Sequence, residues 1–200
     1  EMSASLVGSE MCIETDAELI KLYEPDTVII ATGSRPFIPP IQGADQDFVV
    51  TAHDVLLGKT EPGNRVVVIG GGLVGAETVD MLGQQCEQVT IIEMLPQIMK
   101  DGEAAPTKYM KERFSQNGVQ IHTSTKLLEI GDHTVTAEKT GKDFLENIDT
   151  VIIAVGVKTD RTLLDSMEHV SCKVLKVGDA NGVKNGYLGI REGYEAGLNA

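Results

Sequence analysis

The segment from Arg65 to Glu77, RVVVIGGGLVGAE, constrains the fold of this chain more than any other feature. Four apolar residues run into three consecutive glycines, and a fourth glycine follows at Gly75. An apolar run that ends in glycines and continues with helical periodicity is typical of a β-strand turning sharply into an α-helix. We therefore expect a strand at 65–69, a helix at about 73–85 and a strand at 88–93, which together form a βαβ unit.

The glycines of this turn have the spacing GxGxxG. In a dinucleotide-binding turn the first glycine permits the tight turn, the second lets the backbone approach a diphosphate, and the third lets the helix pack on the strand. An acidic residue, Glu93, follows 18 residues after Gly75 and ends the next strand. A carboxylate at this place accepts hydrogen bonds from an adenosine ribose. The predicted dinucleotide-binding residues are Gly70, Gly72, Leu73, Val74, Gly75 and Glu93.

Glu93 also bears on which dinucleotide binds. Its carboxylate would repel a 2′-phosphate, and the residues that follow it, MLPQIM, contain no Arg or Lys before Lys100. The pattern therefore favours NAD(H) over NADP(H). Lys100 keeps the NADP(H) alternative open, because a mobile loop could bring its ammonium group to a phosphate.

Composition and charge exclude several classes of partner. The chain has 200 residues and a formal net charge of −13, which argues against an extended nucleic-acid partner because that binding depends on clustered Lys and Arg. No apolar run is long enough to span a bilayer, and the first ten residues, EMSASLVGSE, do not resemble a signal peptide. We expect a cytoplasmic protein.

The cysteines and histidines do not form a pattern typical of a metal site. Cys12, Cys86 and Cys172 are far apart and have no CxxC spacing, so neither a disulfide framework nor a zinc site is expected. We expect reduced, structural thiols, with Cys86 on the same helical face as Gly75, Val79 and Leu82. The histidines stand alone at His53, His122, His133 and His169.

The segments before the glycine turn predict short elements. Thr15 and Glu18 have the spacing of a capping box, which predicts a helix over 15–23. The run TVIIATG, which ends at Gly33, predicts a strand buried on both faces. The prolines of SRPFIPPIQG predict an irregular linker, and residues 51–58 predict a short capped helix.

The segments after the βαβ unit predict a helix over about 103–118 and then four short strand-like runs, VQIHTS, KLLEI, TVTAEK and DFLEN. The turns between these runs indicate an antiparallel meander. Another buried strand, DTVIIAVG, follows at 149–156. The chain ends with a strand leading to Gly178 and Asp179 and with a helix from about Tyr187, whose apolar stripe would be Tyr187, Ile190, Tyr194 and Leu198.

Two nearly identical strands bracket the glycine turn. DTVIIATG at 26–33 and DTVIIAVG at 149–156 both end in glycine. This arrangement is expected if one nucleotide-binding unit is inserted inside another. Either strand alone would not indicate it, because buried strands commonly end in glycine.

These motifs, in the order DTVIIATGSRPFIPP, RVVVIGGGLVGAE, DTVIIAVG and VGDA, resemble the two-dinucleotide-binding flavoproteins of the pyridine nucleotide-disulfide oxidoreductase superfamily. The ending GDANGVKNGYLGIREGYEAG is similar to the C-terminal portion of multidomain NADH:flavin oxidoreductases of the 2-enoate and 2,4-dienoyl-CoA reductase type. The resemblance implies an α/β fold in which a Rossmann-like NAD-binding domain with an antiparallel meander, 61–156, is inserted into an incomplete FAD-binding domain, 1–60 and 157–200.

The resemblance also implies roles for residues outside the glycine turn. Gly156 would end its strand close to the nicotinamide, and Glu77 matches a carboxylate near the same ring, although a solvated acid of the first helical turn is an equally simple role for it. Thr32 and Gly33 would line the FAD side. Asp179, after Gly178, would hydrogen-bond the ribityl chain of the flavin. Ile190 and Arg191, at the start of the last helix, would face the flavin.

The sequence departs from this family in three respects. It contains a single GxGxxG turn, so the glycine-rich unit that holds the FAD diphosphate is missing, and we expect the chain to be a C-terminal fragment that ends within a helix. The related enoate-type enzymes carry an FMN barrel and an iron–sulfur cluster, and this chain has no cysteine run for a cluster. It also has no cysteine pair of the disulfide reductases.

The resulting hypothesis is a part of an FAD-dependent oxidoreductase that passes hydride from NADH to FAD for an enoate- or dienoyl-type substrate. The expected partners are NADH, the remainder of the flavoenzyme and a second copy in a homodimer. No catalytic acid or base is named, because the cofactors supply the reactivity. The alternatives are an NADH oxidase, a ferredoxin-reductase-like flavoenzyme, and a non-catalytic nucleotide-binding module.

Overall fold

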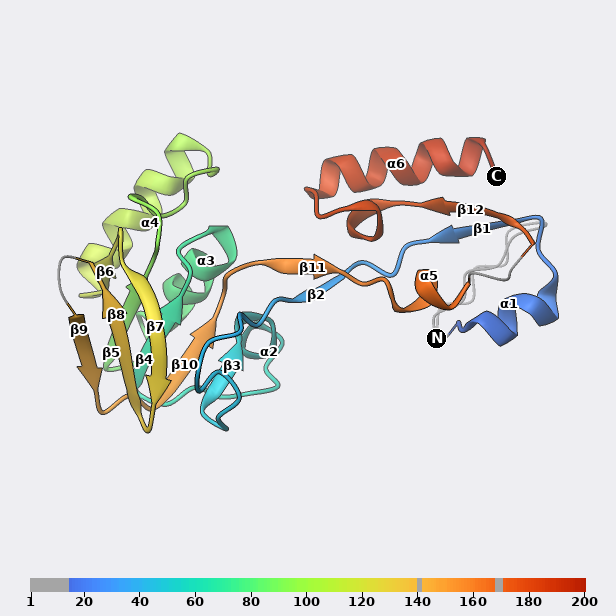
Figure 1. The fold of residues 1–200 in the computed structure, drawn as a ribbon. Coiled ribbons are helices and arrows are strands. Elements are labelled where there is room, and N and C mark those ends of the chain that lie inside the picture. The colour runs from blue at the N-terminus through green and yellow to red at the C-terminus, as the bar shows by residue number, and fades with distance from the viewer. Residues whose placement is uncertain (1–14, 140–141, 168–170) are drawn as a thin grey trace. The chain divides into compact units, whose positions relative to one another are not determined.

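The chain divides into two compact units, each seen in the computed structural model of Figure 1, which describes residues 15–139, 142–167 and 171–200. One unit comprises Glu1–Arg35 and Val157–Ala200, and the other is the continuous segment Pro36–Gly156. The continuous unit starts at Pro36, whereas the sequence suggested a start at residue 61. The reason is that strand β3 (Val49–Thr51) pairs with β10 (Thr150–Ile153) and so belongs to the sheet of this unit.

The continuous unit is built on a five-stranded sheet with the strand order β3-β10-β4-β5-β6. Every neighbouring pair in it is parallel. The predicted βαβ unit is present as β4 (Arg65–Ile69), α3 (Leu73–Leu82) and β5 (Gln88–Ile92). This parallel core confirms the expected Rossmann-like α/β fold.

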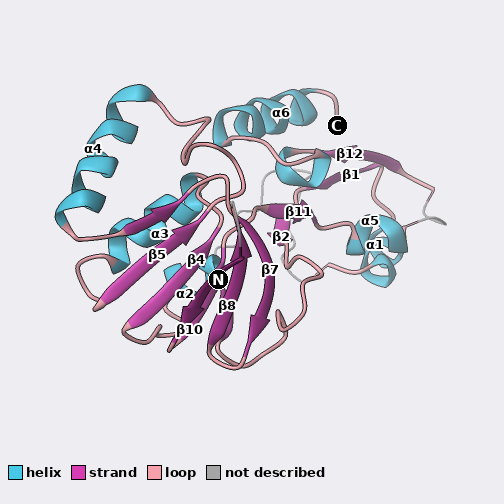
Figure 2. Cartoon of the chain, turned by 60° about the vertical axis from the view of Figure 1, so that its left-hand side comes forward, coloured by secondary structure: helices cyan, strands magenta, loops and turns pink. Residues whose placement is uncertain are grey.

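Helices cover one face of this sheet. They are α2 (Ala52–Leu56), α3 and α4 (Ala104–Gln116), and Figure 2 shows them with the strands. Alternate residues of β4 point to opposite faces. Val66 and Val68 therefore join a buried cluster with Val79 and Phe114 of the helices, whereas the intervening residues of β4 pack on the other side.

A three-stranded antiparallel sheet, β7-β8-β9, supplies the apolar side chains that pack on the other face. Its strands are Lys126–Gly131, Thr134–Glu138 and Lys142–Glu146. The expected meander is thus present, but with three strands rather than four. The run VQIHTS forms β6 (Gln120–His122), which instead extends the parallel sheet beside β5, because α4 acts as a crossover and returns the chain to the same edge.

The other unit contains a two-stranded parallel sheet of β1 (Thr27–Ile30) and β12 (Lys173–Lys176). Helices α1 (Ala17–Tyr23) and α5 (Thr162–Ser166) belong to the same unit, and Ile20 and Met167 form part of its core. The expectation that β1 is buried on both faces is wrong. Ile29 is 40% exposed, since β12 is the only strand paired with β1 among the described residues.

The segment expected to be an irregular linker contains a short strand, β2 (Ser34–Pro36), which pairs with β11 (Val157–Thr159). Proline at the end of such a short strand is tolerated because it need not donate a ladder hydrogen bond. Helix α1 also differs in its cap, because the Asp16 carboxylate, rather than Thr15, accepts the Leu19 N–H at 2.8 Å.

The last helix, α6 (Gly186–Leu198), carries the expected apolar stripe, and this stripe is exposed in the part of the chain that the structure describes. Tyr187 is 72% exposed and Ile190 is 78% exposed. The helix packs instead through small residues. A Cβ atom on Gly189 would lie 3.5 Å from the Cα atom of Gly178, in the 3₁₀ helix η1 (Gly178–Asn181), and Ala196 is buried.

Of the cysteines, Cys12 lies outside the described residues, and Cys86 and Cys172 are free thiols. Helix α3 ends at Leu82, earlier than expected, but Cys86 still packs against the core that contains Val79. Burial, and then the nearby Asp149 carboxylate, raise the pKa of the Cys86 thiol, which agrees with an unreactive structural thiol. No helix among the described residues combines the length and apolarity that crossing a membrane requires.

Candidate functional site

The glycine turn lies between the carboxyl end of β4 and the first residue of α3, at the edge of a parallel sheet where nucleotides bind in folds of this class. Gly70 has a φ of +103°, and a Cβ atom there would come within 2.6 Å of the Ala154 carbonyl oxygen. A Cβ atom on Gly75 would lie 2.0 Å from the Gly70 carbonyl oxygen. The packing of the protein itself therefore requires glycine at both positions.

Gly72 differs from these two glycines. Its φ of −66° suits any residue, and a Cβ atom added to it would meet no heavy atom within 4 Å. No contact within the described chain accounts for a glycine here. The bare backbone at Gly72 instead leaves space beside the helix terminus for an atom that belongs to a ligand.

The first turn of α3 also offers free hydrogen-bond donors. Its N-cap residue, Gly72, has no capping side chain, and the first turn contains no acidic residue. The N–H groups of Gly72, Leu73 and Val74 donate none of the hydrogen bonds that the described residues form with one another. Such donors, together with the positive end of the helix dipole, favour the binding of an anion such as a diphosphate.

Glu93 follows β5 and is tied to the turn through both of its carboxylate oxygens. Oε2 accepts the Gly71 N–H at 2.6 Å, and Oε1 accepts the Leu95 N–H at 2.7 Å. A carboxylate offers about four lone-pair positions, so each oxygen can accept a further hydrogen bond. The two backbone donors orient the group, and the remaining positions are those that ribose hydroxyls could use.

Exposed apolar side chains lie on the segments that follow the strands at this edge of the sheet. Leu73 and Val74 begin α3, Met94 and Leu95 follow Glu93, and Val155 follows β10. All five are among the exposed large hydrophobic residues. Apolar surface of this kind suits the flat faces of nucleobase and nicotinamide rings.

The two remaining residues predicted on this side are Gly156 and Glu77. Gly156 has a φ of +109°, accepts the Phe37 N–H at 3.0 Å and has open space where a Cβ atom would be. Glu77 is exposed and lies in the second turn of α3, because the helix begins at Leu73. Glu77 is thus a solvated acid, as one of its two expected roles requires, but it lies in the second turn rather than the first.

The residues predicted for the FAD side belong to the other unit. Gly33 has a φ of +74° and open space at its Cβ position, and Thr32 donates to the Asp160 carbonyl at 3.2 Å. The Asp179 carboxylate accepts the Ser34 hydroxyl at 2.7 Å and the Lys184 N–H at 2.9 Å. The hydrogen bond from Ser34, and then that from the Lys184 N–H, lower the pKa of Asp179. The Asp179 carboxyl group is therefore favoured in its ionised form, which accepts hydrogen bonds.

Ile190 and Arg191 do not lie at the start of α6 as expected. The helix begins at Gly186, so both fall in its second turn, and Arg191 pairs with Glu195 at 2.8 Å. The N-cap of α6 is Asn185, whose side chain accepts the Leu188 N–H. The expected position of these two residues at the start of the last helix is therefore wrong.

The structure adds polar residues that sequence reasoning missed. Glu192 accepts the Gly178 N–H at 2.9 Å and pairs with Lys184, and the Lys184 hydrogen bond is the main reason that the pKa of Glu192 is lowered. Gly71 and Ser34 were also missed. Gly71 could have been found as the glycine that GxGxxG does not require, whereas nothing in the sequence points to Ser34 or Glu192.

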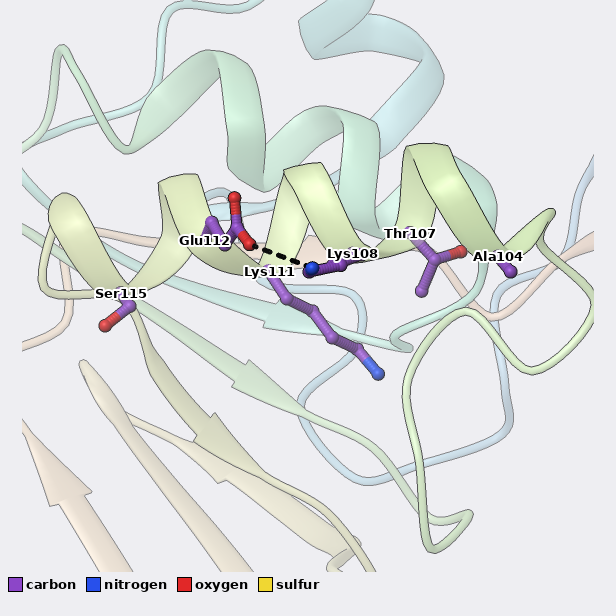
Figure 3. Close-up of a pocket in the computed structure, with 6 residues that line it drawn as sticks. All are labelled: Ala104, Thr107, Lys108, Lys111, Glu112 and Ser115. Carbon is purple, nitrogen blue, oxygen red and sulfur yellow. Dashed lines mark ion pairs between the residues drawn. The ribbon is translucent and has the colours of Figure 1, made fainter.

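A shallow surface hollow elsewhere in the continuous unit is lined by α4 alone, as Figure 3 shows. Its one ion pair joins Lys108 and Glu112 at 4.0 Å. Because one helix supplies every lining residue, the hollow has no opposite wall that could enclose a ligand. None of the predicted cofactor residues lines it; the lining consists of Ala104, Thr107, Lys108, Lys111, Glu112 and Ser115.

Comparison with known proteins supports a single family. Residues 9–183 match the family described as pyridine nucleotide-disulphide oxidoreductase. The chain is 38% identical over 189 residues to an NADH oxidase of Thermoanaerobacter brockii, covering 92% of this chain and 29% of the relative. It is 32% identical over 196 residues to a cinnamate reductase of Clostridium sporogenes, covering 96% of this chain and 29% of the relative.

Among solved structures, a 2-naphthoyl-CoA reductase in complex with 2-naphthoyl-CoA superimposes with a TM-score of 0.85 at 29% identity. The match covers 94% of this chain and 29% of that protein. The chain spans between 29% and 31% of the length of the first curated relatives that it matches.

Proposed function

The chain belongs to the pyridine nucleotide-disulphide oxidoreductase family, and from this premise we propose that its continuous unit binds NADH as the hydride donor of a flavoprotein oxidoreductase. The observation that carries the proposal is the start of α3. There the Gly72 backbone has open space beside it, and three neighbouring N–H groups lack a partner in the described chain. A diphosphate fits both features.

The choice of NADH over NADPH rests on Glu93. Its carboxylate is already oriented by the Gly71 and Leu95 N–H groups, and its free lone pairs would accept hydrogen bonds from the two ribose hydroxyls. A 2′-phosphate at the same place would bring two anions together, which is unfavourable. The similarity to an NADH oxidase supports the same choice.

The chain's own residues act in binding and orientation. The turn from Gly70 to Gly75 would hold the diphosphate, Glu93 the ribose, and Gly156 with Val155 would lie beside the nicotinamide. On the FAD side, Gly33, Gly178 and Asp179 would contact the flavin nucleotide. When bound, the nicotinamide supplies a hydride and the flavin accepts it, so no side chain of this chain is assigned as a catalytic acid or base.

For the longer protein we propose an enoate- or dienoyl-type substrate, reduced at a site outside this chain with FMN and an iron–sulfur cluster as further carriers. The likeness to a cinnamate reductase supports this, because cinnamate is itself an enoate. The likeness to an NADH oxidase favours a second candidate, in which the reduced flavin is reoxidised without an organic substrate. In both cases this chain alone would bind NADH without completing the reaction, because its sequence holds a single GxGxxG turn.

The experiment is calorimetric titration of the chain with NADH and with NADPH. We expect tighter binding of NADH. Glu93→Ala should weaken NADH binding by about tenfold to a hundredfold, since hydrogen bonds to a charged acceptor contribute about 1.5–3 kcal/mol, and it should reduce the preference between the two nucleotides.

The matched control is Glu87→Ala, which removes the same charge from an exposed residue before β5 and should leave both affinities unchanged. Absence of NADH binding would contradict the proposal. An unchanged preference in Glu93→Ala would contradict the assignment of the selection to Glu93.

A further inference from the structure

The backbone of Gly71 is held at both its N–H group and its carbonyl group by the segment that follows β5. Its N–H donates to the Glu93 carboxylate at 2.6 Å, and its carbonyl oxygen accepts the Met99 N–H at 2.7 Å. We call residues 93–103 the β5–α4 segment. Glu93 lies at its beginning and Met99 in its middle. The glycine turn and this segment are therefore joined at two points.

Side-chain packing joins them at a third point. Ile98 is 3% exposed and Met99 is 4% exposed, although both lie between exposed neighbours. A Cβ atom on Gly71 would lie 2.4 Å from Cγ2 of Ile98. Met99 has a φ of +53°, which is uncommon for a residue other than glycine. The segment adopts this conformation where it contacts the turn.

We propose that Glu93 is a positioning residue for the glycine turn as well as an acceptor for ribose, and that it holds the β5–α4 segment on the turn before any nucleotide binds. The diphosphate then meets donors that are already ordered, which reduces the entropy lost on binding. The inference rests on the proposed function only for the identity of the nucleotide.

This arrangement also bears on Lys100, the first basic residue that follows Glu93 in the sequence. Lys100 follows Met99, whose N–H is bonded to the Gly71 carbonyl oxygen. The Lys100 backbone is therefore held near the turn through its neighbour Met99, and the segment is not free to carry Lys100 as a mobile loop would. The preference for NADH depends on this anchoring as well as on the charge of Glu93.

Amide hydrogen exchange of the full chain without nucleotide tests the proposal. The Gly71 and Leu95 amides should exchange about tenfold or more slowly than that of Gly72, after correction for intrinsic rates, because their N–H groups are bonded within the protein. Glu93→Gln keeps only one acceptor oxygen, so it should raise the exchange rate of at least one of these two amides by about tenfold. Glu87→Gln is the control and should leave them unchanged.

Exchange rates of both Gly71 and Leu95 within about twofold of the unsubstituted chain in a folded Glu93→Gln variant would overturn the proposal. If that variant does not fold, the comparison of Gly71 with Gly72 in the unsubstituted chain decides, and equal rates there overturn it. Titration of the same samples with NADH separates the two ideas. If the unsubstituted chain does not bind NADH but Glu93→Gln still loses the protection of the Gly71 amide, the proposed function is contradicted and the positioning role is supported.

Discussion

The four glycines of the turn make different demands, and alanine substitutions at Gly72 and Gly75 separate them. At Gly75 the new methyl group would lie 2.0 Å from the Gly70 carbonyl oxygen and 3.3 Å from Cβ of Ala154. Overpacking of this kind costs about 1–3 kcal/mol, and contact with backbone rather than a flexible side chain places the cost at the upper end. The gain of about 1 kcal/mol from alanine in a helix does not offset it.

At Gly72 the methyl group would meet no atom of the protein within 4 Å, and the φ of −66° suits alanine. The free energy of unfolding should therefore change by less than about 0.5 kcal/mol. The same methyl group would occupy the space that we propose for the diphosphate. We expect the affinity for NADH to fall about tenfold or more, which corresponds to about 1.4 kcal/mol.

Two assays on the same samples measure these effects. Urea denaturation followed by circular dichroism should show Gly75→Ala destabilised by about 2 kcal/mol, or a thermal midpoint lowered by about 4–8 °C. Calorimetry should show the loss of NADH binding in Gly72→Ala. The reasoning is refuted if Gly72→Ala is as unstable as Gly75→Ala, or if it binds NADH with unchanged affinity.

Two further predictions concern the unit that contains β1 and β12. Hydrogen bonds from the Thr162 hydroxyl and N–H, and then from Arg35, lower the pKa of Asp160 to about 2. Because this folded-state pKa lies below the ordinary value of 3.8, the carboxylate stabilises the fold above pH 3.8 and loses that effect as the pH falls towards 2. Thr162→Val removes the hydroxyl donor and should raise the pKa of Asp160 in an NMR titration. An unchanged pKa of Asp160 would contradict the assigned cause. Ile190→Ser, at a residue 78% exposed, should change the free energy of unfolding by less than about 0.5 kcal/mol, whereas a loss of several kcal/mol in urea denaturation would mean that the apolar stripe of α6 is buried.

The βαβ unit was predictable because each of its signals is local. The apolar run of β4, the glycine spacing and the helical periodicity of α3 all lie within 65–82 and agree with one another. The parallel pairing of its two strands followed from the helix that connects them, because such a crossover returns the chain in the same direction. The helix ended three residues early, at Leu82, because such boundaries depend on the cap rather than on the periodicity.

The features that were predicted wrongly, or not predicted, depend on contacts distant in sequence. An isolated three-residue run such as β6 has the same pattern in a parallel sheet and in a meander, and only its pairing with β5 decides between them. Helix α6 has an apolar stripe typical of a core-facing helix. Its small residues turned out to decide which face packs, because Gly189 allows close approach to Gly178, and spacing alone does not reveal this.

The candidate site was predictable to a similar extent. Glu93 was recognised from its distance to the turn, but its bonds to Gly71 and Leu95 require knowing how the chain returns after β5. The Ser34 hydroxyl and Asp179 are 145 residues apart in sequence, and no spacing rule connects them. Sequence patterns thus identify residues whose role is set by their own element, and miss those that act through a partner from another element.

Three consecutive glycines are more than a dinucleotide turn requires, and each meets a separate demand. Gly70 has a backbone conformation that other residues rarely adopt, with a φ of +103°. Gly71 leaves room for the side chain of Ile98, which would lie 2.4 Å from a Cβ atom. At Gly72 no heavy atom of the described protein lies within 4 Å of the position that a Cβ atom would take. It follows that the requirement at Gly71 depends largely on Ile98, since a smaller side chain there would remove the closest contact, that of Cγ2. At Gly72 no contact within the described chain requires glycine, so any requirement there would come from the proposed nucleotide.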